Sequence, residues 1–340
     1  MKFSISLIRA ATAAAALAAA ACQTQTGYVA VDGAMLGTTV HVAARTGRPA
    51  GEIYAAMMDI DSQAKASMSV FDPASRLNRL NANMTDSLDE HIEYNIRLAE
   101  RISRISGGRY DITVKPLVEA WGFIRRQPDA NPDIDSILAF VGHDKIRIEG
   151  GRLVKSDPRV QIDLNSIAKG YTVDLAARQL EQMGIGDYIV EIGGEIRCRG
   201  VNPRGGAWVV GIDSPFDGND SPGSSLQTRI ALSDKALATS GNYRRYWTDD
   251  QGRKVAHTID PLTGRSSVSR LLSATVIAGT CAEADALCTM FMAMGDRQAI
   301  ELARKADTLA VYFILDADDG DGDGGFGVFC SEPMKRLIIE

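Results

Sequence analysis

The chain has 340 residues, of which 45% are hydrophobic and 24% are charged, and its formal net charge is -6 at pH 7. This composition is ordinary for a globular protein, and the length suffices for one large domain or two closely packed ones. The acidic balance, without a basic stripe or an aromatic RNA-binding motif, argues against a nucleic-acid partner. If the ligand is an anion, the positive field that attracts it must be local.

The first 22 residues predict a secretory signal and not a membrane span. They join a basic start at Lys2 and Arg9 to an apolar stretch and a run of small residues that ends in Cys22. A cysteine directly after three alanines is typical of lipoprotein processing, in which Cys22 becomes the lipidated first residue of the mature chain. Plain cleavage near Ala21 is the alternative. No other apolar run is long enough to span a bilayer.

In the N-terminal half, residues 23–27 predict a short tether. Alternating apolar and small residues from 28 to about 43 predict two strands broken at Gly37. Helices are predicted at 52–65, 89–106 and 167–183. In the second of these, apolar residues recur at steps of three and four, and a pair of glycines ends it. Gly184 ends the third.

The C-terminal half is predicted to hold most of the strands. Strands are expected at 188–192, 208–213, 228–232 and 271–278, followed by helices at 281–294 and 296–305 and a hairpin of 309–315 with 327–330. The segment 215–225, rich in Pro, Gly, Ser and Asp, predicts a surface loop. Because the strands cluster without regular alternation with helices, the expected fold class is α+β, with a largely antiparallel sheet packed by helices.

The start of the helix near residue 167 is a candidate phosphate site. Either Asn165 or Ser166 can cap this helix, so that its free N–H groups point outward beside Lys169. The alternative is an ordinary capped helix with a solvated lysine, because helix N-termini are many and anion sites are few.

The pair Gly193 and Gly194 follows a predicted strand. Two adjacent glycines let the backbone approach a flat or bulky ligand closely. A bulge or a tight turn is the alternative. The pattern is not the G-x-G-x-x-G fingerprint, so a dinucleotide-binding fold gets no support from it.

The predicted helix that begins near 281 carries Asp285 and Thr289 one turn apart. This spacing puts a carboxylate and a hydroxyl on one face, and both are hard oxygen ligands of the kind that Mg²⁺ takes together with substrate phosphate and water. Apolar neighbours predict that Asp285 is buried, so it needs a cation or a donor as partner. In the alternative, Thr289 bonds to its own helix and Asp285 pairs with an arginine.

The stretch KVAHTIDPLTGR at 254–265 holds one of only four histidines. His257 ends a short apolar run, and Asp260 is close enough to orient its imidazole or to bind elsewhere in the turn that Pro261 and Gly264 fix. A histidine near neutrality can take a proton from an attacking hydroxyl. A satisfied core histidine is the alternative. The other three histidines lack comparable neighbours.

Two further features carry less chemistry. Residues 316–325, DADDGDGDGG, copy the start of a calcium loop, but Cys330 stands where the bidentate glutamate belongs, and we interpret them as a solvated hairpin tip. The cysteines besides Cys22 are 198, 281, 288 and 330. None forms a C-x-x-C pair, and we interpret them as small core residues, with one disulfide as the alternative.

Eight motifs, in order from about Gly33 to Met334, resemble the ApbE family of FAD:protein FMN transferases. They are LGT at 36–38, SVFDPASRLNRLN at 69–81, GRYDITVKPLVEAWGF at 108–123, the set of Asp163, AKGY at 168–171 and Asp174, IGGE at 192–195, ATSGNY at 238–243, HTIDPLTG at 257–264 and AEADALCT at 282–289. Any one of them alone is weak, whereas eight in family order are specific. Residues 23–340 are then expected to form one ApbE-like domain behind the signal of 1–22.

The resemblance implies an α+β fold that binds FAD and Mg²⁺. The family moves the FMN half of FAD to a Thr or Ser hydroxyl of an acceptor flavoprotein, such as a subunit of a membrane redox complex, and releases AMP. It implies an exported protein on the periplasmic side of a bacterial membrane, held only by a lipid at Cys22.

The resemblance also assigns roles to residues. His257 is the expected base, with Asp260 beside it, and the expected metal ligands are Asp285, Thr289 and the carbonyl of Ala168. Expected ligand-binding residues are Phe71 against the flavin, Lys169 at the pyrophosphate, and Asp174, Gly193, Gly194, Glu195, Thr239, Ser240 and Gly241 around them.

Four positions depart from the family pattern, namely Leu36, Phe71, Asn165-Ser166 and Glu195. None removes the expected base or metal ligands. Two other functions remain open: a Mg²⁺-dependent FAD pyrophosphatase that gives FMN and AMP, and a periplasmic protein that only holds FAD. The first needs the same residues, whereas the second does not need His257, Asp285 and Thr289.

Overall fold

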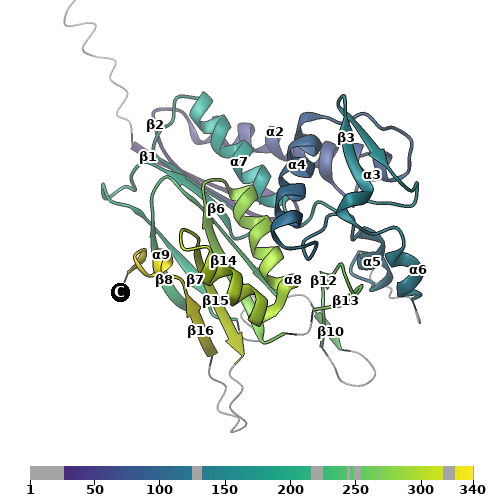
Figure 1. The fold of residues 1–340 in the computed structure, drawn as a ribbon. Helices are drawn as coiled ribbons and strands as arrows, with labels where there is room; N and C mark the ends of the chain where they lie inside the picture. Colours follow the sequence, from purple (N-terminus) through teal and green to yellow (C-terminus); the bar gives the residue numbers. More distant parts are fainter. Residues whose placement is uncertain are drawn as a thin grey trace, which may run out of the picture.

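A computed structural model gives the fold of this chain (Figure 1). The structure describes residues 27–124, 132–215, 225–242, 246–248, 254–267, 269–316 and 326–339. The predicted signal, Cys22, nearly all of the tether, most of the 215–225 loop and most of the 316–325 segment lie outside these residues. Among the described residues, no helix combines the length and the apolar character that a membrane crossing requires.

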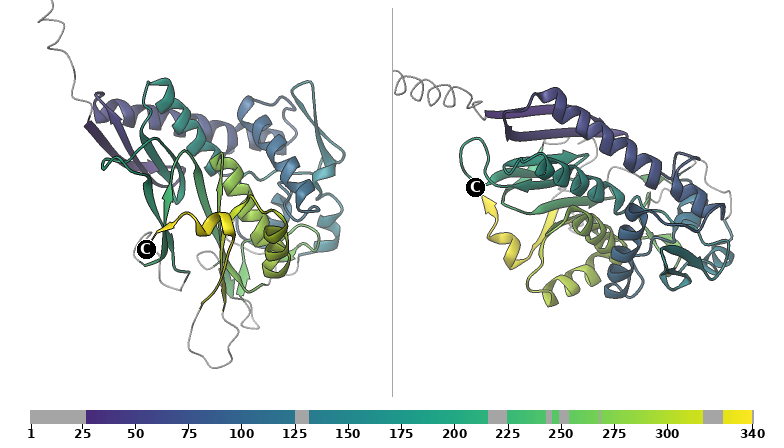
Figure 2. Two further views of the ribbon diagram at one scale, coloured as in Figure 1. Left: turned by 60° about the vertical axis from the view of Figure 1, so that its left-hand side comes forward. Right: turned by 90° about the horizontal axis from the view of Figure 1, so that it is seen from above.

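An eight-stranded sheet forms the centre of the fold. Its spatial order is β1 (Gly27–Met35), β2 (Thr38–Thr46), β5 (Tyr188–Ile192), β6 (Glu195–Arg199), β9 (Ala236–Gly241), β14 (Leu271–Ala278), β15 (Ala310–Asp316) and β16 (Phe326–Cys330). Every neighbouring pair is antiparallel. Figure 2 shows the N-terminal hairpin in purple and the C-terminal hairpin in yellow at opposite ends of this row. The predicted α+β class with an antiparallel sheet is confirmed.

Smaller sheets surround the central one. They are β7 (Trp208–Asp213), β8 (Leu226–Leu232) and β17 (Ile338–Ile339), and the pairs β3 (Ile146–Glu149) with β4 (Arg152–Lys155), β10 (Tyr246–Thr248) with β11 (Lys254–Ala256), and β12 (Ile259–Asp260) with β13 (Arg265–Ser266). Sequence analysis missed β3, β4, β6, β9, β17 and the short strands from β10 to β13. These strands are short or rich in Ala, Ser, Gly and Arg, so the alternation of apolar and polar residues alone gives a weak signal.

The helices lie beside the central sheet and in a separate group to its right in Figure 1. They are α2 (Ala50–Met68), α3 (Arg76–Asn81), α4 (Glu90–Ile105), α5 (Lys115–Ala120), α6 (Ile134–Leu138), the 3₁₀ turn η1 (His143–Lys145), α7 (Ala168–Gln182), α8 (Cys281–Lys305) and α9 (Glu332–Lys335). The backbone of Gly295 is not helical, with φ 73° and ψ 170°. This break separates the two helices predicted at 281–294 and 296–305.

The core occupies both faces of the central sheet. On one face, α2 and α7 pack against β1, β2 and β5, and α8 packs against β9 and β14. On the other face, side chains such as Ile277 and Ile314 pack against Trp208 and Ile230 of the β7–β8 layer. Cys198, Cys281 and Cys288 are buried thiols and Cys330 is half-buried, and all four are free. Three of the four are therefore the small core residues that we expected.

Helices α7 and α8 cross at Gly170, and this contact positions the site described below. A Cβ atom at Gly170 would lie 2.3 Å from the carbonyl oxygen of Cys281 and 2.8 Å from Cβ of Asp285. Neither atom belongs to the far end of a flexible side chain, so a larger residue must push the helices apart. The Gly170 N–H also donates to Asp285 Oδ2 at 2.9 Å.

We therefore expect Gly170→Ala to lower the free energy of unfolding by about 3 kcal/mol, the upper part of the usual range for overpacking. Chemical denaturation monitored by circular dichroism measures this change. Gly186→Ala is the matched control, because a Cβ there meets nothing within 4 Å, and we expect a change within about 0.5 kcal/mol. Equal stability of the two variants would contradict the importance of the close crossing.

Candidate active site

A pocket of about 610 Å³ lies where the central sheet meets the helical group. The turn between β5 and β6, the end of β9, the start of α7, the middle of α8 and the β12 turn all line it. Eleven of the fourteen predicted site residues line this pocket: Phe71, Lys169, Gly193, Gly194, Glu195, Thr239, Ser240, Gly241, His257, Asp285 and Thr289. The fold thus brings together segments that are up to 218 residues apart in sequence, from Phe71 to Thr289.

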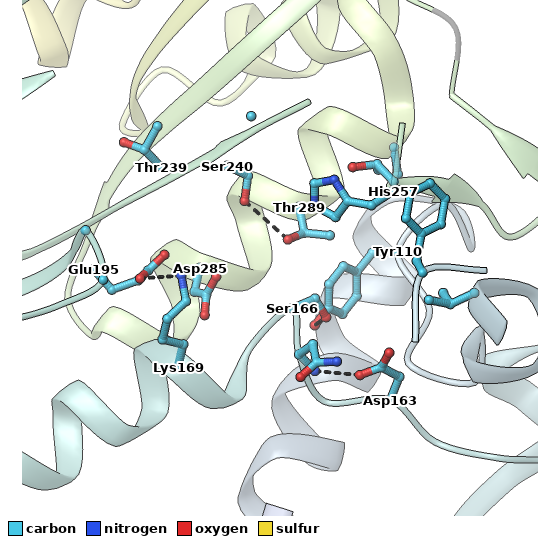
Figure 3. A pocket seen from close by; sticks show the side chains of 18 of the residues that line it. Tyr110, Asp163, Ser166, Lys169, Glu195, Thr239, Ser240, His257, Asp285 and Thr289 are labelled. Atoms are coloured by element: carbon cyan, nitrogen blue, oxygen red, sulfur yellow. Dashed lines mark hydrogen bonds and ion pairs between the residues drawn. The ribbon is translucent and has the colours of Figure 1, made fainter. Parts of the chain in front are cut away.

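One end of the pocket holds two buried carboxylates around one ammonium group (Figure 3). Lys169 Nζ lies 2.5 Å from Glu195 Oε2, and Asp285 lies beside them. Burial raises the pKa of Asp285, and it raises the pKa of Glu195 to about 7. Burial acts to lower the pKa of Lys169, but the carboxylates of Glu195 and Asp285 outweigh this effect and raise it. Each group thus depends on its neighbours for charge compensation.

This end of the pocket fits a divalent cation. In the part of the chain that the structure describes, no three His, Cys, Asp or Glu side chains group closely enough to hold a metal by themselves. However, Asp285 and Thr289 offer hard oxygens one turn apart on α8, and the nearby carboxylates exceed the one ammonium in charge. Mg²⁺ is commonly held by one or two carboxylates plus substrate phosphates, so the donor set suits it.

The contacts of Asp285 and Thr289 differ from the alternative drawn from sequence. Asp285 accepts the Gly170 N–H and lies beside a lysine, not an arginine. Thr289 Oγ1 lies 3.4 Å from Ser240 Oγ on the neighbouring strand β9. The carbonyl of Ala168 accepts the Thr172 hydroxyl at 2.7 Å and is not part of the pocket lining. Its role as a metal ligand stays a prediction.

The other end of the pocket holds His257, between β11 and β12. Its imidazole is half-buried, and the Phe123 ring meets it edge to face with centroids 6.3 Å apart. The following turn is fixed on several sides: Gly264 N donates to the Asp260 carbonyl at 2.8 Å, and Trp121 Nε1 donates to the Gly264 carbonyl at 2.8 Å. His257 is therefore held at the pocket wall by a rigid turn, and the interpretation as a core histidine does not fit its position.

Asp260 is a framework residue of that turn. Its Oδ1 accepts the Leu262 N–H at 3.0 Å, and its Oδ2 accepts Nη1 of Arg109 at 2.7 Å. Its side chain is 11% exposed and is not part of the pocket lining. These contacts make Asp260 a positioning residue of the turn, and a direct part in catalysis stays a prediction.

Asp174 also differs from the prediction. Its carboxylate accepts the N–H groups of Cys281 at 3.0 Å and Ala282 at 2.9 Å, and Arg197 donates to it at 2.5 Å. Unpaired N–H groups and the positive end of the helix dipole at the start of α8 favour a carboxylate there. Asp174 is buried and absent from the pocket lining. It thus holds α7 to α8, and its assignment as a cofactor-binding residue stays a prediction.

The start of α7 is built differently from the expected cap. The helix follows Ile167 and has no side-chain cap. Ser166 Oγ instead lies 3.0 Å from the hydroxyl of Tyr110, and Asp163 accepts the Asn165 N–H at 2.8 Å. Neither Asn165 nor Ser166 caps the helix, because both belong to a loop that the Tyr110 hydroxyl and the Asp163 carboxylate hold against the pocket.

The glycine pair forms a tight turn, one of the two alternatives that the sequence left open, and this turn also lines the pocket. Gly193 and Gly194 form the turn between β5 and β6 with φ of 60° and 100°, where other residues are strained. A Cβ at Gly193 would lie 2.6 Å from Cγ2 of Thr38. The same turn lines the pocket, so its backbone is open to a ligand.

The mouth of the pocket is partly apolar. Phe71 is 64% exposed there, and Val118, Phe123 and Ile124 supply further apolar surface. Sequence reasoning assigned no role to Arg109, Tyr110, Asp163, Val118 or Phe123, although all except Asp163 lie in the GRYDITVKPLVEAWGF stretch. The usable signal was a concentration of aromatic and charged residues around the short helix α5, because segments that connect longer elements often carry function.

An α+β protein whose pocket brings together buried carboxylates suited to a cation and a histidine held at the wall has the arrangement of an enzyme active site. Residues 36–313 match the model of the ApbE family, and the chain belongs to this family. It is 36% identical to the FAD:protein FMN transferase of Haemophilus influenzae over 95% of both chains. Its identity to the FAD:protein FMN transferase of Vibrio cholerae is 34%, over 96% of this chain and 97% of that one.

Solved structures agree with this assignment. The flavin transferase ApbE from Vibrio cholerae superposes with a TM-score of 0.78 at 31% identity, covering 92% of this chain and 99% of that one. The apo form of the flavinyl transferase ApbE from Pseudomonas stutzeri superposes with a TM-score of 0.81 at 28% identity, covering 92% of this chain and 97% of that one. The whole described fold is therefore that of the family.

Proposed function

We propose that this chain, a flavin transferase by family, moves the FMN half of FAD to a Thr or Ser hydroxyl of an acceptor protein, with Mg²⁺, and releases AMP. The observation that carries this proposal is one pocket with His257 at one end and the Lys169, Glu195 and Asp285 group at the other. A transferase needs both ends, because a hydroxyl nucleophile must lose a proton while a phosphate group is held and polarised.

The chemistry is a single phosphoryl transfer. The acceptor hydroxyl oxygen forms a bond to the phosphorus of the FMN half, and the bond from that phosphorus to the bridging oxygen breaks. AMP leaves with the bridging oxygen. His257 takes the hydroxyl proton, because a weak nucleophile near pH 7 needs a general base.

The residues at the Asp285 end of the pocket compensate the negative charge of the substrate phosphates. Asp285 and Thr289 would hold Mg²⁺, which would supply Lewis-acid stabilisation of the charge on the phosphates. The Lys169 ammonium balances the negative charge of the buried Glu195 and Asp285 carboxylates. It also lies at the pocket wall, where it would contact the pyrophosphate. The β5–β6 turn and the end of β9 bring their backbone close to the ligand, and the apolar mouth with Phe71 receives the flavin ring.

Intact mass measurement tests the proposal. The purified chain lacking residues 1–22 is incubated with FAD, Mg²⁺ and a candidate acceptor flavoprotein. We expect the acceptor to gain the mass of FMN less one water, with AMP released and metal required. Free FMN and AMP beside an unmodified acceptor would support the pyrophosphatase instead. FAD that stays uncleaved under these conditions would support a protein that only binds FAD.

We also propose that the chain is exported to the periplasmic side and anchored by a lipid at Cys22. The support is the sequence of residues 1–22 alone, with three alanines before this cysteine. Cys22→Ser is expected to move the protein from the membrane fraction to the soluble periplasmic fraction, measured by fractionation and immunoblot. Equal membrane association of both forms would contradict the anchor.

A further inference from the structure

The pocket contains many more acidic than basic groups. Its described lining includes the carboxylates of Asp111, Asp163, Glu191, Glu195, Asp213 and Asp285, whereas its lysine and arginine side chains within the described residues are Lys169 and Arg109. A substrate with two phosphates adds more negative charge, and like charges repel strongly in a poorly hydrated site. Each positive group in the lining therefore matters for binding.

Lys169 alone does not supply the missing positive charge. Its ammonium group is already 2.5 Å from Glu195, and Asp285 also acts on it. One positive charge thus serves two carboxylates of the protein before any substrate arrives. A second cation is needed at the other end of the pocket.

Arg109 has the geometry for this task. In the described part of the chain, its side chain makes one hydrogen bond, from Nη1 to Asp260 Oδ2 at 2.7 Å, and it is 26% exposed. A guanidinium carries five N–H donors in a planar fork, so four remain for a ligand. Such a fork matches the oxygens of a phosphate group in a bidentate manner.

The contact with Asp260 also fixes where Arg109 lies. Asp260 stands three residues after His257 in the same rigid turn, so the guanidinium is held at the His257 end of the pocket. Figure 3 shows Lys169 and His257 on opposite sides of the labelled group. Arg109 and Lys169 thus meet different parts of a bound substrate.

We propose that Arg109 binds the phosphate of the FMN half of FAD, the phosphate whose phosphorus the acceptor hydroxyl attacks. This inference rests on the proposed function, because it takes FAD as the substrate. In this arrangement the Asp260 carboxylate positions Arg109. Because Asp260 and His257 belong to the same turn, Arg109 then lies beside the base. The phosphate would then lie between the Arg109 guanidinium at one end and a cation held by the α8 oxygens at the other.

Flavin binding without turnover tests this role. Riboflavin and FMN differ by the phosphate alone, so their dissociation constants are measured by flavin fluorescence in EDTA, where metal-dependent transfer cannot proceed. Arg109→Gln is expected to weaken the binding of FMN and FAD about tenfold or more, as for the loss of a charged hydrogen bond. Riboflavin binding is expected to change by less than about twofold, because it lacks the phosphate that the guanidinium contacts.

Two further variants separate binding from folding. Arg109→Lys keeps the charge and should recover part of the FMN affinity. Arg104→Gln makes the same chemical change on the exposed face of α4, where Arg104 pairs with Glu100, and should change neither affinity. Equal losses for riboflavin and FMN in Arg109→Gln, or no loss for either, would overturn the proposal. If the unaltered chain binds none of the three flavins, the proposed function itself fails, and this inference with it.

Discussion

Replacing His257 with alanine is expected to lower the rate of FMN transfer by about a hundredfold to ten-thousandfold, the usual contribution of a general base. The imidazole lies at the pocket wall, where an incoming acceptor hydroxyl would meet it. FAD binding is expected to persist, since the flavin and phosphate contacts assigned above come from other residues. Single-turnover transfer to the acceptor, followed by intact mass, measures the rate, and flavin fluorescence measures FAD binding.

A matched histidine separates this effect from general damage. His41 is 45% exposed on β2 and pairs with Asp32 at 2.6 Å on the outer hairpin of the sheet. His41→Ala should transfer FMN at the rate of the unaltered chain. Transfer by His257→Ala at a near-normal rate would remove the base role, and a parallel loss of FAD binding would show that His257 supports the pocket and not the proton transfer.

Local signals in the sequence predicted the fold class and part of the pocket, whereas Phe71, Glu195 and residues 239–241 were predicted only through the resemblance to the ApbE family. The spacing of Asp285 and Thr289 on one helix, the turn residues after His257 and the paired glycines each work within a few residues of chain. Regular helices and long strands gave strong periodic patterns, and Gly295 marked the break inside α8. Local signals of this kind are reliable, because the folded chain keeps the turns and helix faces that the local sequence predicts.

The sequence could not predict the hydrogen-bond and ion-pair partners that lie far apart along the chain. Arg109 and Asp260 are 151 residues apart, and Gly170 and Asp285 are 115 apart. Asp174 belongs to a family motif, yet its carboxylate is used by α8, which begins 107 residues later. A carboxylate in a motif can thus serve the ligand or the framework, and only the tertiary contacts distinguish these uses.

The same reasoning applies to Asp174 and Asp260, two predicted site residues that the pocket lining does not include. Asp174 and Asp260 are buried, and each accepts hydrogen bonds from backbone N–H groups as well as from an arginine. Buried carboxylates need such partners, so they often hold two elements together. Asp285 differs from both, because it has one N–H partner and shares the Lys169 ammonium with Glu195. Of these three carboxylates, Asp285 is the one that lines the pocket and can coordinate a ligand there.

Replacing Asp285 with asparagine is therefore expected to abolish Mg²⁺ binding at the site and to lower FMN transfer about a hundredfold or more. Metal stabilisation of a phosphoryl transition state contributes several kcal/mol, and each 1.4 kcal/mol changes the rate tenfold. Asparagine keeps an oxygen for the Gly170 N–H but has no charge, so the α7–α8 crossing should remain intact. Asp285→Ala removes this oxygen as well and should also lose transfer.

The measurement is a calorimetric titration of Mg²⁺ in the presence of FMN, together with the metal dependence of transfer. Glu283→Gln is the matched control, because it removes a charge from the first turn of the same helix without touching the pocket lining. It should keep the Mg²⁺ affinity of the unaltered chain. If Asp285→Asn also keeps that affinity, the metal is held elsewhere, and the buried carboxylate then serves only to balance Lys169 at the junction of α7 and α8.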